Sequence, residues 1–175
     1  MNAGNVTVTG LAMDVPLTYH ATPGSYISAA YSGYLWTSSH PATVVVTGSA
    51  DVPAFTLNVT APNPISVTSP SAQSNSTYTI SRGSALAVTW TGGVEGMVTV
   101  GVSSGTTATG QISISCSVDA ATGAVTVPAP FMAKLGATGG FSAGVTNVTN
   151  KTIGDWLMHF QAGTSKDEGT ATFTN

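Results

Sequence analysis

The sequence predicts an all-β protein of antiparallel strands, and three observations predict it. Apolar residues alternate with Ser, Thr or Ala in many short runs, and this period of two marks a strand with one buried face. Gly and Pro separate the runs, with 20 Gly and 9 Pro in 175 residues, and both residue types favour turns. Val and Thr suit strands, whereas Ser, Thr, Val and Gly are weak helix formers.

The chain carries few charges, and this excludes several classes of partner. Asp, Glu, Lys and Arg make up 6% of the residues and the net charge is −3, against about 25% charged residues in ordinary soluble domains. The hydrophobic fraction of 42% favours a folded chain over a disordered one. Basic residues are scattered, so we expect no nucleic-acid partner and no polybasic membrane patch. No apolar run approaches the roughly 18 residues of a membrane helix, so we expect no membrane span.

Residues 1–61 are predicted to form an N-terminal β subdomain. We expect its strands at 6–9, 11–20, 26–36, 44–46 and 55–59. Pro16 cannot donate to a strand ladder, which predicts that the second of these strands lies at an edge or is bulged. His40-Pro41 is expected to start a connection. The sequence Ala61-Pro62-Asn63-Pro64 then predicts a short stiff linker into a second domain, residues 62–175.

The second domain begins with the clearest alternation in the chain. Apolar residues share one face at Leu86, Val88 and Trp90, and again at 98, 100 and 102. Three glycines lie between the two runs, which predicts an antiparallel hairpin of strands 84–91 and 97–103. Short strands at 65–68 and 77–80 precede it. Short strands at this spacing, with turns between them, are typical of an antiparallel β-sandwich of the immunoglobulin type.

The rest of the second domain continues the same rhythm. We expect a loop at 103–110, followed by strands at 112–118, 125–127, 141–148, 156–160 and 170–174. Asn150-Lys151 is a predicted turn, and 162–169 is a predicted charged loop. Proline at 128 and 130 with Gly136 beyond them predicts one short helical turn that crosses between sheets.

Two stretches of this domain resemble known families. The stretch ISVTSPS at 65–71, followed by STYTISRGSALAVTWTGG at 76–93, is similar to the opening of Ig-like domains in bacterial surface proteins. It also resembles the N-terminal domain of the fungal Ser/Thr-rich, GPI-anchored cell-wall family. Cys116 with DAATGAVTVPAPFMAKLGA at 119–137 resembles myxobacterial-type surface lipoproteins. The resemblance spans residues 62–136 and implies an extracellular β-sandwich module. Its motifs are structural, so no functional residue is carried over.

The compartment is predicted from the cysteine and from the composition. A single cysteine excludes an internal disulfide, and Cys116 is in phase with Ile114 and Val118, so we expect it to pack in the core. No apolar signal segment follows Met1. Chains rich in Ser and Thr and poor in charge are typical of cell surfaces. We therefore expect an extracellular or outer-surface protein whose signal sequence has been removed.

One candidate binding site is an aromatic cluster formed by Tyr31, Tyr34 and Trp36. Aromatic rings on a β-sandwich can stack against the apolar faces of sugars. The alternative is that these rings fill the junction between the two parts of the chain, because buried aromatics dominate small cores.

Catalytic and metal-binding patterns are weak in this sequence. His20, His40 and His159 lie in separate segments, and no G-x-S-x-G elbow is present. The acidic residues are single apart from Asp167-Glu168, whereas glycosidases need two facing carboxyl groups. No H-x-H, H-E-x-x-H or C-x-x-C motif suggests a metal. We expect no catalytic residue, no metal and no cofactor.

The sequence thus favours a non-enzymatic extracellular or cell-surface module with a structural, adhesive or assembly role. Its expected partner is a cell-surface protein or polysaccharide. Self-association is a further expectation, because few charges protect the sheet edges from one another. The alternative is a carbohydrate-binding module that uses the aromatic cluster. A hydrolase would need a histidine or a pair of acids that converge in a pocket.

Overall fold

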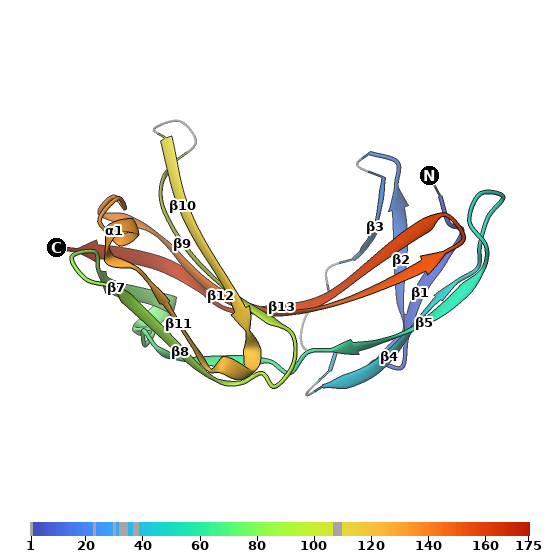
Figure 1. The fold of residues 1–175 in the computed structure, drawn as a ribbon, viewed down its shortest axis with the longest axis horizontal. Coiled ribbons are helices and arrows are strands. Elements are labelled where there is room, and N and C mark those ends of the chain that lie inside the picture. The colour runs from blue at the N-terminus through green and yellow to red at the C-terminus, as the bar shows by residue number, and fades with distance from the viewer. Residues whose placement is uncertain (1, 23, 30, 32–34, 37–38, 107–109) are drawn as a thin grey trace. The chain divides into compact units, whose positions relative to one another are not determined.

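The computed structural model describes residues 2–22, 24–29, 31, 35–36, 39–106 and 110–175. Strands dominate these residues and most neighbouring strands run antiparallel, which confirms the predicted all-β class (Figure 1). By packing, the chain divides into two compact units. Unit 1 comprises Met1–Ala61 and Asn147–Ala162, and unit 2 comprises Pro62–Thr146 and Gly163–Asn175.

The two units share two strands of the chain. Strands β12 (Thr138–Ile153) and β13 (Trp156–Thr174) contribute residues to both units. The end of β12, the turn after it and the start of β13 form the segment 147–162, which packs in unit 1. We call this segment the 147–162 hairpin. The expected division of the chain into domains 1–61 and 62–175 stays a prediction. In packing, the 147–162 hairpin lies with the first 61 residues.

Unit 1 contains one five-stranded sheet in the order β3-β2-β1-β4-β5. Its strands are β1 (Val6–Thr9), β2 (Val15–His20), β3 (Ser25–Ser28), β4 (His40–Val46) and β5 (Phe55–Ala61). All neighbouring pairs are antiparallel. The alternation seen in the sequence places Val6, Val44 and Val46 on one buried face. Against that face pack Trp156, Met158 and Phe160 of the 147–162 hairpin.

Prolines in this sheet lie where a neighbouring strand has ended. Strand β2 is an inner strand, but β3 pairs only with Leu17–His20, so Pro16 has no strand on that side and needs no donor there. The expected start of this strand at residue 11 was wrong, since β2 begins at Val15. His40-Pro41 was expected to be a connection, but both residues are in β4 and pair with β5. Pro41 is tolerated because β1 pairs with β4 only as far as Thr43.

The expected long strand at 26–36 was also wrong. Strand β3 ends at Ser28, and residues 31, 35 and 36 lie outside any strand. The sequence contains Gly33 and four Ser or Ala residues in this region, which weaken the strand pattern. Tyr34 and Gly33 lie outside the described residues.

Unit 2 contains two sheets that share one core. The larger has the order β10-β9-β12-β13-β7 and the smaller β11-β8-β6. Besides β12 and β13, the strands are β6 (Ile65–Ser69), β7 (Thr77–Ser81), β8 (Leu86–Gly92), β9 (Met97–Thr106), β10 (Gly110–Asp119) and β11 (Ala124–Val127). Strands β7 and β13 run parallel, in contrast to the other pairs. Two 3₁₀ turns lie at Ser74–Ser76 and Ala120–Thr122.

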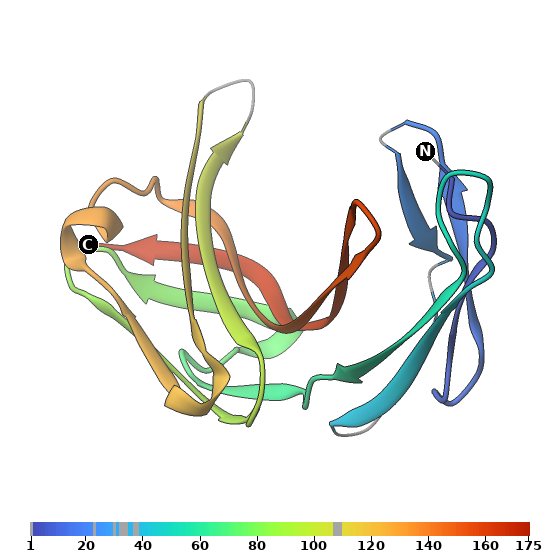
Figure 2. The same cartoon turned by 45° about the vertical axis from the view of Figure 1, so that its right-hand side comes forward.

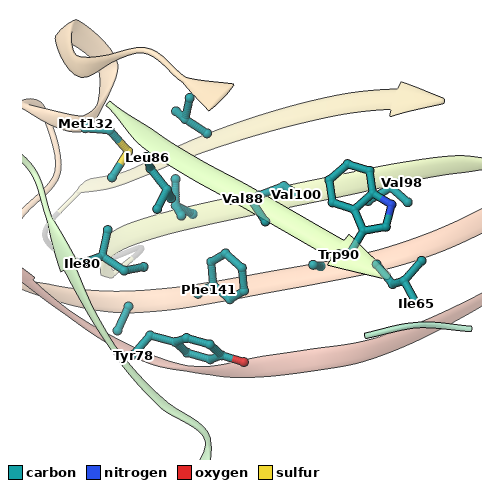
Figure 3. Packing of buried hydrophobic residues seen from close by; sticks show 14 of the residues in the cluster. Ile65, Tyr78, Ile80, Leu86, Val88, Trp90, Val98, Val100, Met132 and Phe141 are labelled. Carbon is teal, nitrogen blue, oxygen red and sulfur yellow. The ribbon is translucent and has the colours of Figure 1, made fainter. Parts of the chain in front are cut away.

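The core of unit 2 is built from the inward faces of both sheets (Figure 3). Phe141 of β12 is 2% exposed and its ring lies 4.6 Å from the ring of Tyr78 on β7. From the smaller sheet, Val88 and Trp90 enter the same cluster. The Trp90 indole N–H donates to the carbonyl of Ala120 at 2.9 Å, so its polar atom is satisfied inside the core.

The predicted hairpin of strands 84–91 and 97–103 was wrong. Strands β8 and β9 follow each other in the chain but belong to different sheets. Gly92, Gly93 and Gly96 take positive φ angles of 78°, 63° and 89°, which lets the chain cross from one sheet to the other. Both strands bury an apolar face, and packing them face to face across the core satisfies that pattern as well as pairing them side by side would.

Two regions predicted to be loops and one predicted to be a turn lie in strands of the structure. The region 103–110 continues β9 to Thr106 and β10 from Gly110, with 107–109 outside the described residues. Strand β9 has neighbours on both sides, so ladder bonds outweigh the weak strand propensity of Ser and Gly. The region 162–169 belongs to β13, and β7 pairs with this strand only beyond it, at Thr170–Thr174. The turn expected at Asn150-Lys151 lies instead at 154–155, where Gly154 has a φ of 57°.

The expected helical turn was confirmed. Helix α1 (Ala129–Met132) begins with Pro130 in its first turn and connects β11 of one sheet to β12 of the other. Met132 is fully buried, so this turn closes one end of the core. Cys116 is half-buried and packs against the same core, as its phase in β10 predicted.

Candidate functional site

The predicted aromatic cluster is only partly described. Tyr31 is half-buried, and Tyr34 lies outside the described residues. Trp36 is half-buried and, with Leu35, lines a cavity of about 190 Å³ in unit 1. The structure therefore does not bring the three residues together as a described surface, and the sugar-stacking platform stays a prediction.

A cavity of unit 1 has a volume of about 670 Å³ and lies between the sheet and the 147–162 hairpin. Valines of β1 and β4 form its floor. Aromatic and thioether side chains form much of the remaining lining, at Tyr26, Phe55, Trp156, Met158 and Phe160, and Ser25, Ser28, His159 and Gln161 are its polar members. This volume lies within the roughly 300–1,000 Å³ range of protein binding sites, which are mostly apolar. We call it the main cavity.

The polar atoms of the main cavity's aromatic rings are already bonded within the chain. The Tyr26 hydroxyl accepts from the backbone N–H of Ala3 at 2.6 Å and lies 2.6 Å from Asn2 Oδ1. The Trp156 indole N–H donates to the carbonyl of Asp51 at 3.2 Å. Since these atoms have partners, both residues offer the cavity their apolar ring surfaces. The chemistry of these rings therefore suits an uncharged apolar group.

The smaller cavity continues the main one along the same strands. The two share Leu17, Ser28, Phe160 and Gln161 in their linings. Val6 and Val46 line the main cavity, whereas the next inward positions of β1 and β4, Val8 and Val44, line the smaller one. The two cavities thus form the successive parts of one apolar groove that follows the strand direction.

Three hydrogen bonds hold the 147–162 hairpin in a fixed register beside β5. Asn147 Nδ2 donates to the carbonyl of Thr60 at 3.0 Å, and Lys151 Nζ donates to that of Thr56 at 2.7 Å. Trp156 Nε1 bonds Asp51 farther along, as described above. Lys151, four residues after Asn147, bonds Thr56, four residues before Thr60, so this part of β12 runs antiparallel to β5. In all three bonds a side-chain nitrogen of the hairpin donates to a backbone carbonyl of residues 51–60.

Of the residues that the structure describes, His159 is the one histidine in the lining of this groove, and no Asp, Glu, Lys or Arg side chain lines it. His40 Nε2 lies 2.6 Å from the carbonyl of Gly10, and His159 Nδ1 lies 2.9 Å from Asn150 Oδ1. Among the described residues, no group of three His, Cys, Asp or Glu side chains could hold a metal ion. No helix in the described part of the chain has the length and apolarity to cross a membrane.

Comparisons of the chain with protein-family models, with curated proteins and with solved structures found no match. The groove is therefore characterised by its own residues. The sequence contains a signal for part of it, because Trp156, Met158 and Phe160 alternate on one face. It contains no signal that this face packs against residues 1–61, about 100 positions away in the chain.

Proposed function

We propose that this protein is a non-enzymatic module of an extracellular or cell-surface assembly, with a structural, adhesive or assembly role. The observation that carries the proposal is the main cavity of unit 1. Its walls are mostly apolar, with Ser25, Ser28, His159 and Gln161 as the polar side chains, and the polar atoms of Tyr26 and Trp156 are bonded within the chain. Such a site binds by apolar burial, at about 25 cal/mol per Å² of apolar surface removed from water. Its occupant in this proposal is a set of apolar side chains from a cell-surface partner protein.

We also propose that the sheets of unit 2 form an immunoglobulin-like sandwich. Strands β6, β8 and β11 correspond to A, B and E of that fold, and β9, β10, β12 and β13 to C, C′, F and G. One sheet then holds A, B and E and the other holds G, F, C and C′, which agrees with the observed strand orders. Strand β7 is an additional strand parallel to β13. This correspondence supports the resemblance of residues 62–136 to surface modules.

The main cavity can be tested with an uncharged apolar fluorophore, N-phenyl-1-naphthylamine. We expect saturable binding near one probe per chain, detected by the rise in probe fluorescence. Met158→Lys places a charge in the lining and should weaken probe binding at least tenfold. The matched control is Leu157→Lys, because Leu157 is the neighbouring residue and is 70% exposed. Circular dichroism confirms that both variants fold.

Two results would contradict the binding proposal. One is a linear, unsaturable rise in fluorescence, which indicates non-specific partition. The other is equal probe affinity in the Met158→Lys and Leu157→Lys variants. The carbohydrate-binding alternative is tested in parallel by acrylamide quenching of tryptophan fluorescence with cell-wall polysaccharides present. If a polysaccharide protects tryptophan fluorescence from acrylamide in the wild type but not in the Trp36→Phe variant, that alternative is favoured.

A further inference from the structure

Most sheet edges in the described part of the chain carry a feature that blocks pairing with another strand. Strands β3 and β11 are four residues long. Strand β5 has carbonyl groups bonded by the 147–162 hairpin. Strand β6 has a register shift between Val67 and Ser69 and is followed by Pro70. Strand β7 has five residues. Short strands, bulges, proline and lysine are the known means of protecting an edge.

Strand β10 has none of these features. It is ten residues long and pairs with β9 at every position from Gly110 to Asp119 without a register shift. On its other side, the described chain provides no strand of the same sheet (Figure 2). Its sequence, GQISISCSVD, contains no proline and no basic residue, and its single charge is at the last position. A long, regular, uncharged edge presents a row of unpaired backbone groups.

The apolar face of β10 is also incompletely covered. Ile112 is 40% exposed, whereas Ile114, Cys116 and Val118 are half-buried against the core. A further strand added to this edge would cover part of that apolar surface as well as satisfying the ladder.

The sequence of β10 suits a second copy of the same strand. In an antiparallel pair, residues directly opposite each other lie on the same face. A two-fold axis perpendicular to the sheet therefore places Ser113, Ser115 and Ser117 among their own copies and the apolar residues among theirs. Self-pairing brings residues close to the two-fold axis near their own copies, and residues 110–118 carry no charge that would repel its copy there. Two-fold dimers of this kind are the commonest oligomers of soluble proteins.

We propose that β10 pairs antiparallel with β10 of a second copy of this chain, across a two-fold axis, so that the two larger sheets form one continuous sheet. This inference rests on the assembly role proposed above and names the partner for it. It uses residues of unit 2 alone, so its failure leaves the probe-binding test of the main cavity unaffected.

The test is sedimentation velocity of the full chain over a concentration series from micromolar to millimolar. We expect the wild type to shift from a 17.5 kDa monomer toward a species of twice that mass. Ser115→Lys places a charge near its own copy on an exposed position of β10 and should weaken dimerisation at least tenfold. Thr172→Lys is the matched control. Thr172 is exposed on β13, an inner strand of the same sheet, and this variant should dimerise like the wild type.

Hydrogen exchange identifies the surface independently. Amides of residues 110–119 should become more protected as the protein concentration rises, while amides of 55–61 should not change. A monomer at every concentration would overturn the proposal. A dimer that Ser115→Lys leaves intact, or one that forms without added protection at 110–119, would also overturn it by assigning the interface to another surface.

Discussion

Replacing Trp90 with phenylalanine tests how the core of unit 2 is held together. Trp90 is 4% exposed, and its indole N–H donates to the carbonyl of Ala120 at 2.9 Å. Phenylalanine keeps a ring on β8 but removes this donor and leaves space where the larger ring was. The variant therefore loses one buried hydrogen bond and part of its apolar packing.

The cost can be worked out from the two losses. Removing a buried donor costs about 1–3 kcal/mol, and the upper values apply when the acceptor is left without a partner. The Ala120 carbonyl also accepts from the N–H of Gly123 at 3.3 Å, so the lower end of that range, about 1 kcal/mol, applies here. The smaller ring adds about 1 kcal/mol for lost packing. We expect Trp90→Phe to destabilise the protein by about 2 kcal/mol.

Urea unfolding followed by circular dichroism measures this loss. With an m-value of about 2 kcal/mol per M, the midpoint should fall by roughly 1 M. Phe141→Leu is the matched control, because it replaces a ring in the same core with a smaller apolar side chain without removing a hydrogen bond. Trp90→Phe should cost about 1 kcal/mol more than Phe141→Leu. Equal midpoints for the two variants would refute the contribution assigned to the hydrogen bond.

Three further predictions compare neighbouring positions or related side chains. A Cβ on Gly139 would collide with the backbone carbonyl oxygen of Ser103 on β9, whereas one on Gly140 meets nothing closer than 3.5 Å. Gly139→Ala should therefore lower the thermal midpoint by several degrees more than Gly140→Ala, and equal midpoints would contradict so close an approach of the two strands. Met132 is fully buried and Phe131 is 50% exposed, so Met132→Ala should cost about 2–5 kcal/mol in urea unfolding and Phe131→Ala less than about 1. The carboxylate of Asp119 accepts from a backbone N–H at 2.8 Å at the start of a 3₁₀ turn, so Asp119→Ala should cost about 1 kcal/mol while Asp119→Asn retains most of the stability. The reverse order of these two variants would show that this bond is not what stabilises the turn.

The sequence contained enough information for the fold class and for most of the strands. Side chains on a strand alternate between two faces, so runs such as Leu86, Val88 and Trp90 show both the strand and its buried face. The short helix was predicted in the same local way, from the fixed φ of proline and from the glycine beyond it. These signals lie within a few residues of the element that they predict.

Pairing was harder to predict than strand formation. Strands β8 and β9 have the pattern expected of a hairpin, but alternation reports that a face is buried and not which strand lies alongside. The three glycines between them allow a tight turn or a crossing between sheets equally. Likewise, Ser103 to Thr106 has a weak strand propensity and became a strand because neighbours on both sides provide ladder bonds.

The candidate site, like the strand pairing, was only partly predictable from the sequence. The aromatic residues of the sequence drew attention to Tyr31, Tyr34 and Trp36, which stand close together in the chain. The main cavity instead combines β1, β3, β4 and β5 with Trp156, Met158 and Phe160 of the 147–162 hairpin. No local pattern relates segments so far apart, because their contact is decided by packing of apolar faces and not by either segment alone.

By itself, the sequence determined that the chain is all-β, poor in charge and built of half-buried strands, because these are properties of composition and of side-chain period. Tertiary structure decided which strands pair, where the 147–162 hairpin packs and which edge is left open. Strand pairing depends on contacts between distant residues, and each ladder is completed or left free by neighbours that the local sequence does not specify. The apolar groove and the unpaired edge of β10 both depend on these contacts between distant residues.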